Sequence, residues 1–201
     1  ECLALTEKLF GKDHPDYALS LSNLASDYSD LGQYEKSLSL NKECLALYEK
    51  LFGKDHPDYA INLNNLATDY SKLGQYEKSL SLNKECLALH KKIYGKDHPK
   101  YVLSLSNLAL DYSKLGQYEK SLSLNKKCLA LCEIIYGKDH PVYASRLNNL
   151  ALDYSALGQH ENSLSLNNEC LVLIEKLFGK DHPKYATSLY YLATNYSDLG
   201  Q

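Results

Sequence analysis

Apolar residues recur at steps of three and four along most of the chain. Between residues 13 and 31 and between residues 34 and 52, the apolar positions are Tyr17, Leu21, Leu24, Ala25, Tyr28 and Leu31, then Tyr34, Leu38, Cys44, Leu45, Tyr48, Leu51 and Phe52. This spacing places apolar side chains on one face of a helix. The pattern predicts two amphipathic helices, which we call helix A and helix B.

Two short sequences mark the ends of these helices. Gly-Lys-Asp-His-Pro begins at residues 11, 53, 95, 137 and 179, and Leu-Gly-Gln begins at residues 31, 73, 115, 157 and 199. Together they contain all 10 glycines and all 5 prolines, which are the residues that most often interrupt helices. We expect Asp13 to cap helix A, Pro15 to occupy its first turn, and Gly11 and Gly32 to adopt left-handed backbone at helix ends.

Both markers recur every 42 residues, so the chain is a series of repeats. Each helix A and helix B form an antiparallel hairpin, which covers its remaining apolar surface only by stacking on another hairpin. The sequence predicts an all-α fold, an α-solenoid, with residues 1–201 forming a single array. Its parts are a partial helix B at 1–10, full repeats at 11–52, 53–94, 95–136 and 137–178, and helix A of a truncated repeat at 179–201.

One longer motif connects the repeats to a known family. The pattern Leu-x-Asn-Leu-Ala-x-Asp-Tyr-x-x-Leu-Gly-Gln-Tyr-Glu occurs at residues 21–35 and 63–77. It resembles tetratricopeptide repeats, and the 42-residue period with Gly-Lys-Asp-His-Pro is similar to the kinesin light chain subgroup. The resemblance covers essentially the whole chain. It implies a right-handed superhelix whose A helices line a concave groove, where relatives bind peptides or protein surfaces.

The sequence departs from this family on helix B. An asparagine stands where the family usually has an aromatic residue between helices, namely at Asn41, Asn83, Asn125 and Asn167. A buried amide needs partners, because leaving one unpaired costs about 1–3 kcal/mol. Two interpretations stay open, a buried polar ladder along the stack and a partly hydrated outer position.

Differences between repeats fall in two places. Of the nine differences between residues 11–52 and 53–94, five lie on helix A away from its apolar stripe and four at the end of helix B. Packing restrains framework positions, whereas a groove is free to vary, so we place ligand binding on helix A. The predicted peptide-binding groove comprises Ser22, Asn23, Ser26, Asn64, Asn65, Thr68, Lys72, Ser106, Asn107, Leu110, Lys114, Arg146, Asn148, Asn149, Leu152, Tyr190 and Tyr191.

The chemistry of this set is mainly amide and hydroxyl. Asparagine donates and accepts hydrogen bonds, so a row of asparagines can satisfy the backbone of an extended peptide; the alternative is that the row caps or cross-links adjacent A helices. The only candidate cations for a clamp that binds a terminal carboxylate are Lys72, Lys114 and Arg146. Tyr190 and Tyr191 replace Ser or Asn and are either an aromatic anchor or a substitution near the end of the chain.

Tyrosines at a fixed phase of helix A have the spacing of core residues. They are Tyr28, Tyr70, Tyr112, Tyr154 and Tyr196. We therefore expect them to be buried.

Cysteine and histidine also follow the repeat. Five of the 6 cysteines, Cys2, Cys44, Cys86, Cys128 and Cys170, occupy one repeat position, and stacked equivalents are too far apart to form disulfides. Buried, reduced thiols are typical of a cytoplasmic protein. We expect the loop histidines His14, His56, His98, His140 and His182 to cap or pack, and we predict no metal site, no cofactor and no catalytic residues.

The charge and the chain ends bear on partners. The 22 Lys and Arg against 25 Asp and Glu favour neither nucleic acid nor a membrane surface as a partner. We predict a non-enzymatic scaffold that binds a protein or peptide. The alternatives are a ligand-sensing arm of a larger signalling ATPase, or a structural repeat that associates end to end through uncapped terminal helices. Because Met is absent and both ends are open half-repeats, we expect a piece of a longer array.

Overall fold

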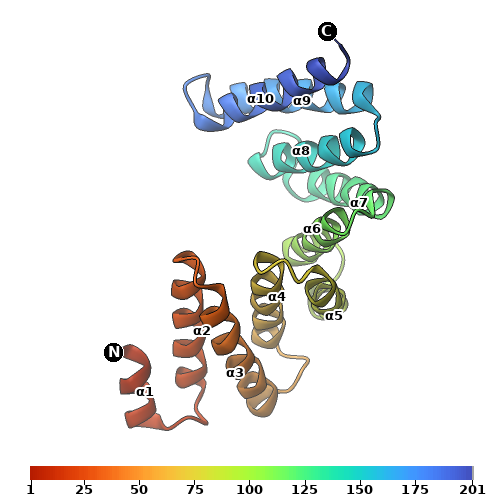
Figure 1. Cartoon of the computed structure of the whole chain (residues 1–201). Coiled ribbons are helices and arrows are strands. Elements are labelled where there is room, and N and C mark those ends of the chain that lie inside the picture. The colour runs from red at the N-terminus through yellow and green to blue at the C-terminus, as the bar shows by residue number, and fades with distance from the viewer. Residues whose placement is uncertain (201) are drawn as a thin grey trace. The chain divides into compact units, whose positions relative to one another are not determined.

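The computed structural model describes residues 1–200, and this part of the chain contains ten α-helices and no strand (Figure 1). The helices are α1 (Cys2–Phe10), α2 (Pro15–Asp30), α3 (Tyr34–Phe52), α4 (Pro57–Lys72), α5 (Tyr76–Tyr94), α6 (Pro99–Lys114), α7 (Tyr118–Tyr136), α8 (Pro141–Ala156), α9 (His160–Phe178) and α10 (Pro183–Asp198). The even-numbered helices are the predicted A helices, and α3, α5, α7 and α9 are the full B helices. The all-α prediction is confirmed.

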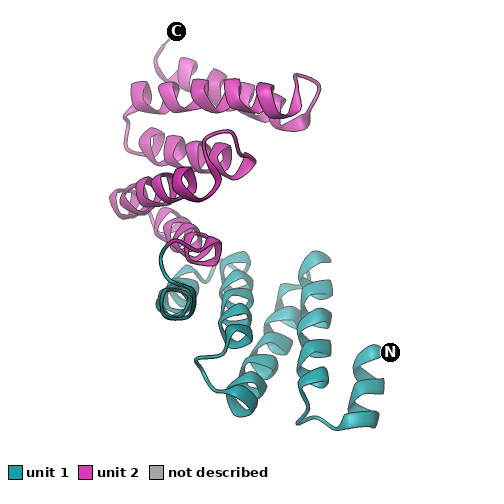
Figure 2. Cartoon of the chain, turned by 180° about the vertical axis from the view of Figure 1, so that it is seen from behind, with its two compact units in different colours: residues 1–96 teal, residues 97–201 magenta. Residues whose placement is uncertain are grey.

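The helices form two compact units, which Figure 2 shows in different colours. The first runs from Glu1 to Lys96 and contains α1 to α5, and the second begins at Asp97 and contains α6 to α10. Within each unit every helix packs against the next along the chain. The A–B hairpin is therefore the building block of both units.

Histidine, rather than aspartate, caps each even-numbered helix. His14 has the extended backbone of an N-cap residue, and its Nδ1 accepts a 3.2 Å hydrogen bond from the backbone N–H of Asp16. The expected cap at Asp13 is wrong, because Asp13 lies one residue too early and its carboxylate instead pairs with Lys50 at 2.7 Å. The same histidine cap begins α4, α6, α8 and α10.

Each marker sequence also ends a helix as predicted. Gly11 and Gly32 have φ of +79° and +72°, a conformation that L side chains rarely adopt. The imidazole of His14 stacks on Phe10 across this loop, with ring centroids 4.7 Å apart. The loop histidines thus both cap and pack, as the sequence indicates.

Small residues let helix A and helix B of one repeat approach closely. Ala18, Ala25 and Cys44 are fully buried, and the Cys44 thiol donates to the carbonyl oxygen of Ala18 at an S···O distance of 3.3 Å. Burial raises the pKa of Cys44 to about 12, so the thiol stays protonated. Cys86, Cys128 and Cys170 make the same contact in later repeats. The prediction of buried free thiols is confirmed for these cysteines and for Cys132, whereas Cys2 is exposed.

The tyrosine row at the end of helix A is not core. Tyr28, Tyr70, Tyr112 and Tyr154 are half-buried and Tyr196 is exposed. Lysine ammonium groups lie over several of these rings, such as Lys36 at 5.1 Å from the centroid of Tyr28. These partly exposed rings therefore contact lysine cations. Leu31, also expected in the apolar stripe, is 69% exposed in the turn that follows α2.

Candidate functional site

A buried polar cluster joins one hairpin to the next. The carboxylate oxygen Oδ2 of Asp69 on α4 accepts hydrogen bonds from the Ser37 hydroxyl at 2.9 Å and from Asn41 Nδ2 at 2.7 Å, both on α3. All three side chains are at most 2% exposed. We call this Ser–Asn–Asp group the polar node.

The node recurs in the second unit. Asp153 on α8 accepts hydrogen bonds from Ser121 at 2.8 Å and from Asn125 at 2.6 Å. The helix B asparagines at this repeat position, Asn41, Asn83, Asn125 and Asn167, are 2–5% exposed. Of the two interpretations, the buried polar ladder is therefore correct, and the partly hydrated outer position is wrong. In the last repeat Asn195 replaces the aspartate and bonds to Ser163.

Sequence reasoning missed the aspartates of the node. Burial raises the pKa of Asp69, while hydrogen bonds from Asn41, Ser37 and Ser29 lower it by less. Burial likewise raises the pKa of Asp153. The available signal was an acidic residue at one fixed phase of helix A, one position before the recurring tyrosine.

The predicted groove residues are mostly accessible. Asn23 and Ser26 are exposed, and Asn65 and Asn149 are half-buried. The other half-buried positions are Ser22, Asn64, Thr68, Asn107, Arg146, Asn148 and Tyr191. The exposed ones include Lys72, Lys114, Leu110 at 50% and Leu152 at 44%.

Two predicted groove residues turn toward each other instead. Arg146 on α8 donates from Nη1 to the hydroxyl of Ser106 on α6, and Ser106 is 7% exposed. The guanidinium also lies beside Cys132 on α7, where it lowers the thiol pKa less than burial raises it. Arg146 is therefore occupied between three helices, whereas Lys114 is exposed at the end of α6.

A first cavity lies among α2, α3 and α4. Its volume is about 90 Å³. It is lined by Ser26, Ser29, Asp30, Ser37, Asn41, Asn65, Thr68 and Asp69. Three predicted groove residues therefore border the polar node of the first unit.

A second cavity lies among α8, α9 and α10. Its volume is about 150 Å³, and it includes Asn148 and Tyr191 together with Lys184 and the buried Cys170. Tyr191 is half-buried and meets Tyr190 edge to face, with ring centroids 5.8 Å apart. Tyr190 itself is 68% exposed. Each unit thus has a hollow bordered by predicted groove residues.

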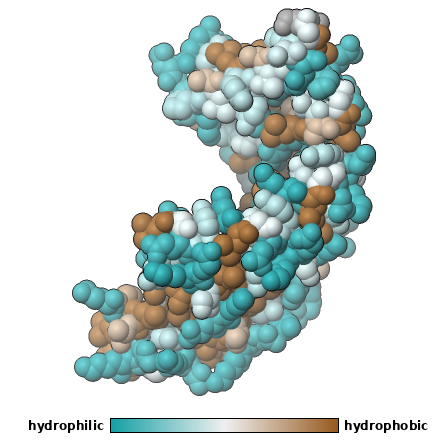
Figure 3. All heavy atoms as spheres, viewed as in Figure 1, coloured by the Kyte–Doolittle hydropathy of each residue, from teal (hydrophilic) through white to brown (hydrophobic). Residues whose placement is uncertain are grey.

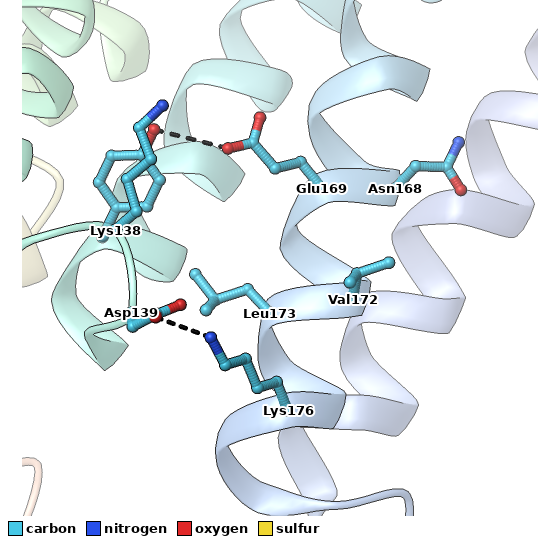
Figure 4. Close-up of a pocket in the computed structure, with 8 residues that line it drawn as sticks. Lys138, Asp139, Asn168, Glu169, Val172, Leu173 and Lys176 are labelled. Carbon is cyan, nitrogen blue, oxygen red and sulfur yellow. Dashed lines mark hydrogen bonds and ion pairs between the residues drawn. The ribbon is translucent and has the colours of Figure 1, made fainter.

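A larger surface hollow of about 460 Å³ lies between the loop before α8 and the outer side of α9 (Figure 4). The Tyr143 hydroxyl donates to Glu169 Oε1 at 3.5 Å, and Lys176 pairs with Asp139 at 2.7 Å. Its lining contains no predicted groove residue. Since its charged groups already have partners in the chain, we assign it no ligand.

Two further properties concern the described residues as a whole. Within residues 1–200, no three or more His, Cys, Asp or Glu side chains gather in a way that would hold a metal ion. None of the helices in that range combines the length and hydrophobicity needed to cross a bilayer.

Comparison with known proteins gives one family and several similar folds. The model of the family described as tetratricopeptide repeat matches residues 1–50, 18–92, 62–134, 101–171 and 143–201. None of the curated proteins matches the chain significantly. The solved TPR-like repeats of a Podosopora anserina protein described as a kinesin light chain are 26% identical, with a TM-score of 0.81, over 94% of this chain and 89% of that chain.

Two more distant structures share the fold alone. BtubC (BKLC) from P. vanneervenii is 20% identical with a TM-score of 0.83, over 99% of this chain and 80% of its own. A Rap protein solved in complex with competence and sporulation factor is 14% identical with a TM-score of 0.77, over 98% of this chain and 52% of its own. The chain therefore spans about half the length of that Rap protein.

Proposed function

Because the chain belongs to the tetratricopeptide repeat family, we propose that it is a non-catalytic scaffold that binds an extended segment of another protein. The binding surface is the row of variable side chains on α2, α4, α6, α8 and α10. One observation carries the proposal: both cavities that adjoin this row, one in each unit, include residues that differ between repeats.

The chemistry of the row suits a backbone ligand. Asn65 and Asn149 are half-buried, so part of each side chain is accessible to a ligand. Each amide offers a donor and an acceptor, which matches the alternating N–H and C=O groups of an extended peptide. The row also favours a protein partner over nucleic acid, since the chain has a net charge of −3.

A peptide selection tests this proposal. A displayed library of 12-residue peptides is selected on the chain, and the best binder is measured by calorimetry. Replacing Asn65, Asn107 and Asn149 by Ala should weaken binding at least tenfold, about 1.4 kcal/mol, with unchanged helicity. The matched control replaces Ser81, Ser123 and Ser165, exposed at equivalent positions of α5, α7 and α9, by Ala and should bind as the wild type does. Equal affinity in all three proteins would reject the row as the binding surface.

Self-association is a second candidate function. Leu5, Leu9 and Phe10 on α1 are 50–61% exposed, and Tyr190 on α10 is 68% exposed. Figure 3 shows apolar side chains gathered at the N-terminal end, over α1 and α2. The face of α1 would take α10 of a second copy, since both are half-repeats with exposed apolar surface. Sedimentation at rising concentration tests it: growth of oligomers that Leu9→Glu abolishes supports it, and a monomer throughout rejects it.

The thiols indicate the compartment. Five cysteines are free and buried, which is the usual state in a reducing environment. We therefore propose that the scaffold works in the cytoplasm. Oxidised cysteines in protein that is isolated without reductant would contradict this proposal.

A further inference from the structure

The first cavity differs in charge from the equivalent place in the second unit, around Ser121, Asn125 and Asp153. Asp30 and Asp69 both line it. At the equivalent repeat positions of the second unit, Lys114 replaces Asp30, while Leu110 and Leu152 replace Ser26 and Thr68. The polar node is the same in both places, so the difference comes from the surrounding residues, which add a second carboxylate and two hydroxyl groups in the first unit.

The acidic groups of this cavity have no cation of their own. None of the ion pairs within residues 1–200 includes Asp30 or Asp69. Asp69 is 1% exposed, and burial raises its pKa because the neighbouring Ser and Asn groups compensate only part of the lost hydration. A positive group in the cavity would supply the missing compensation.

A second observation independently points to a hydrogen-bond donor as ligand. Asn41 lines the cavity and is 2% exposed, yet its Oδ1 has no hydrogen-bond partner among the described residues. Its Nδ2 is already used, donating to Asp69 and Ser37. Buried acceptors are seldom left unpaired, because the lost hydration is not recovered. Asn41 therefore has an unused amide oxygen next to a buried carboxylate. Asn125 Oδ1 is unpaired in the second unit as well, so only the surrounding residues distinguish the two places.

The size of the cavity limits what enters it. A volume of about 90 Å³ is well below the roughly 150 Å³ of a cavity that holds a benzene ring. This is room for the charged end of a long side chain and too little for an aromatic ring. The ammonium of lysine is compact and carries three donors, and Asp30, Asp69 and Asn41 Oδ1 provide acceptors.

We propose that this cavity binds the cationic end of a Lys or Arg side chain from the segment that occupies the A-helix row. The proposal rests on the proposed function for the origin of that side chain. The cavity adds side-chain specificity to a row whose asparagines bind only the peptide backbone. The first unit selects a basic residue, and the corresponding place in the second unit, with Leu110, Leu152 and Lys114, does not.

The cavity can be tested without any partner, using n-butylammonium as the probe. The probe is titrated into the chain, and its binding is followed by NMR at the side-chain amides of Asn41, Asn65 and Asn125. We expect saturable shifts at Asn41 and Asn65 and none at Asn125. Asp30→Lys, which copies Lys114, should weaken the probe at least tenfold, and the pair Ser26→Leu and Thr68→Leu, which copies the second unit, should abolish its binding. Absent shifts, equal shifts at Asn125, or equal shifts with sodium or calcium chloride would overturn the proposal.

The peptide selection separates this proposal from the function on which it rests. On the wild type we expect Lys or Arg enriched at one peptide position, and on the Asp30→Lys protein we expect that enrichment to be lost. Peptides that lack a basic residue and bind both cavity variants as tightly as the wild type would overturn the cavity assignment while leaving the scaffold function intact. If butylammonium binds as described and no peptide is selected, the cavity assignment is supported and the scaffold function fails.

Discussion

The side-chain amide of Asn41 donates a 2.7 Å hydrogen bond to the carboxylate of Asp69 in the next repeat. The same bond joins Asn125 to Asp153 at 2.6 Å. These bonds link successive hairpins within each unit, so the stack is held by directional polar contacts in addition to apolar burial. A contact of this kind fixes the register of neighbouring hairpins, because a shift of one turn leaves buried donors unpaired.

Removing one acceptor of the node should destabilise the second unit. Asp153→Ala leaves the buried Ser121 hydroxyl and Asn125 amide without their shared acceptor. We expect a loss of about 2–3 kcal/mol in the free energy of unfolding, measured by urea denaturation followed by circular dichroism.

Asp153→Asn provides the control for this prediction. Asparagine retains an acceptor, and Asn195 already occupies this position in the last repeat, where it bonds to Ser163. We expect a change within about 1 kcal/mol at neutral pH. Equal losses for the two variants would show that size, rather than hydrogen bonding, decides stability at this site.

The node carboxylates predict a pH dependence. The pKa of Asp153 is raised above its ordinary value of 3.8 by burial, so the folded chain holds this proton more tightly than the unfolded chain. Its contribution to stability is therefore most favourable below pH 3.8 and is lost as the pH rises through the raised folded value. Because Asp153→Asn does not titrate, its stability relative to the wild type should increase across that window. Urea midpoints of both proteins at each pH give this difference, and a constant or decreasing difference would contradict the raised pKa.

A pair of substitutions tests the packing around Arg146. The small Cys132 lies beside the guanidinium. Two repeats earlier, Tyr48 stands at the position of Cys132 and Asn62 at the position of Arg146. We expect Cys132→Tyr alone to destabilise by about 1–3 kcal/mol through overpacking, and Arg146→Asn added to it to recover most of the loss. Thermal melts of the four proteins of this cycle give the coupling; additive effects would show that the two side chains are independent.

The histidine cap predicts a local loss of helix stability. His140 Nδ1 accepts a 3.1 Å hydrogen bond from the N–H of Val142. His140→Ala should cost about 1 kcal/mol, and His140→Asn, which keeps a capping acceptor, should cost less. Hydrogen exchange at the first turn of α8 measures this. Unchanged exchange in both variants would assign His140 to packing alone.

Much of the fold follows from local signals. Helix B was predicted between residues 34 and 52 and is α3, Tyr34–Phe52. This agreement has a physical reason: glycine and proline occur only in the two repeated markers, so each helix continues until it reaches one of them. The position of the cap was less predictable, because both Asp13 and His14 have an acceptor and only the backbone conformation distinguishes them.

The site was less predictable because it depends on neighbouring repeats. Asp69 has the sequence features of a surface carboxylate, and hydrogen bonds from Ser37 and Asn41 on the neighbouring hairpin stabilise it in its buried position. Arg146 has the features of a groove charge, yet the same repeat position is buried in other repeats, at Asn62, Ser104 and Ser188. In both cases the periodicity of one helix contains no information on what the next hairpin presents.

The most direct test of the central claim is an NMR footprint of the selected peptide on the chain. The scaffold proposal predicts that the largest shifts fall on the A-helix row, at Asn65 and Thr68 in the first unit and at Asn149 and Leu152 in the second. Shifts concentrated instead on the outer side of the B helices, at Glu85, Lys126 or Lys176, with the asparagine row unchanged, would contradict it.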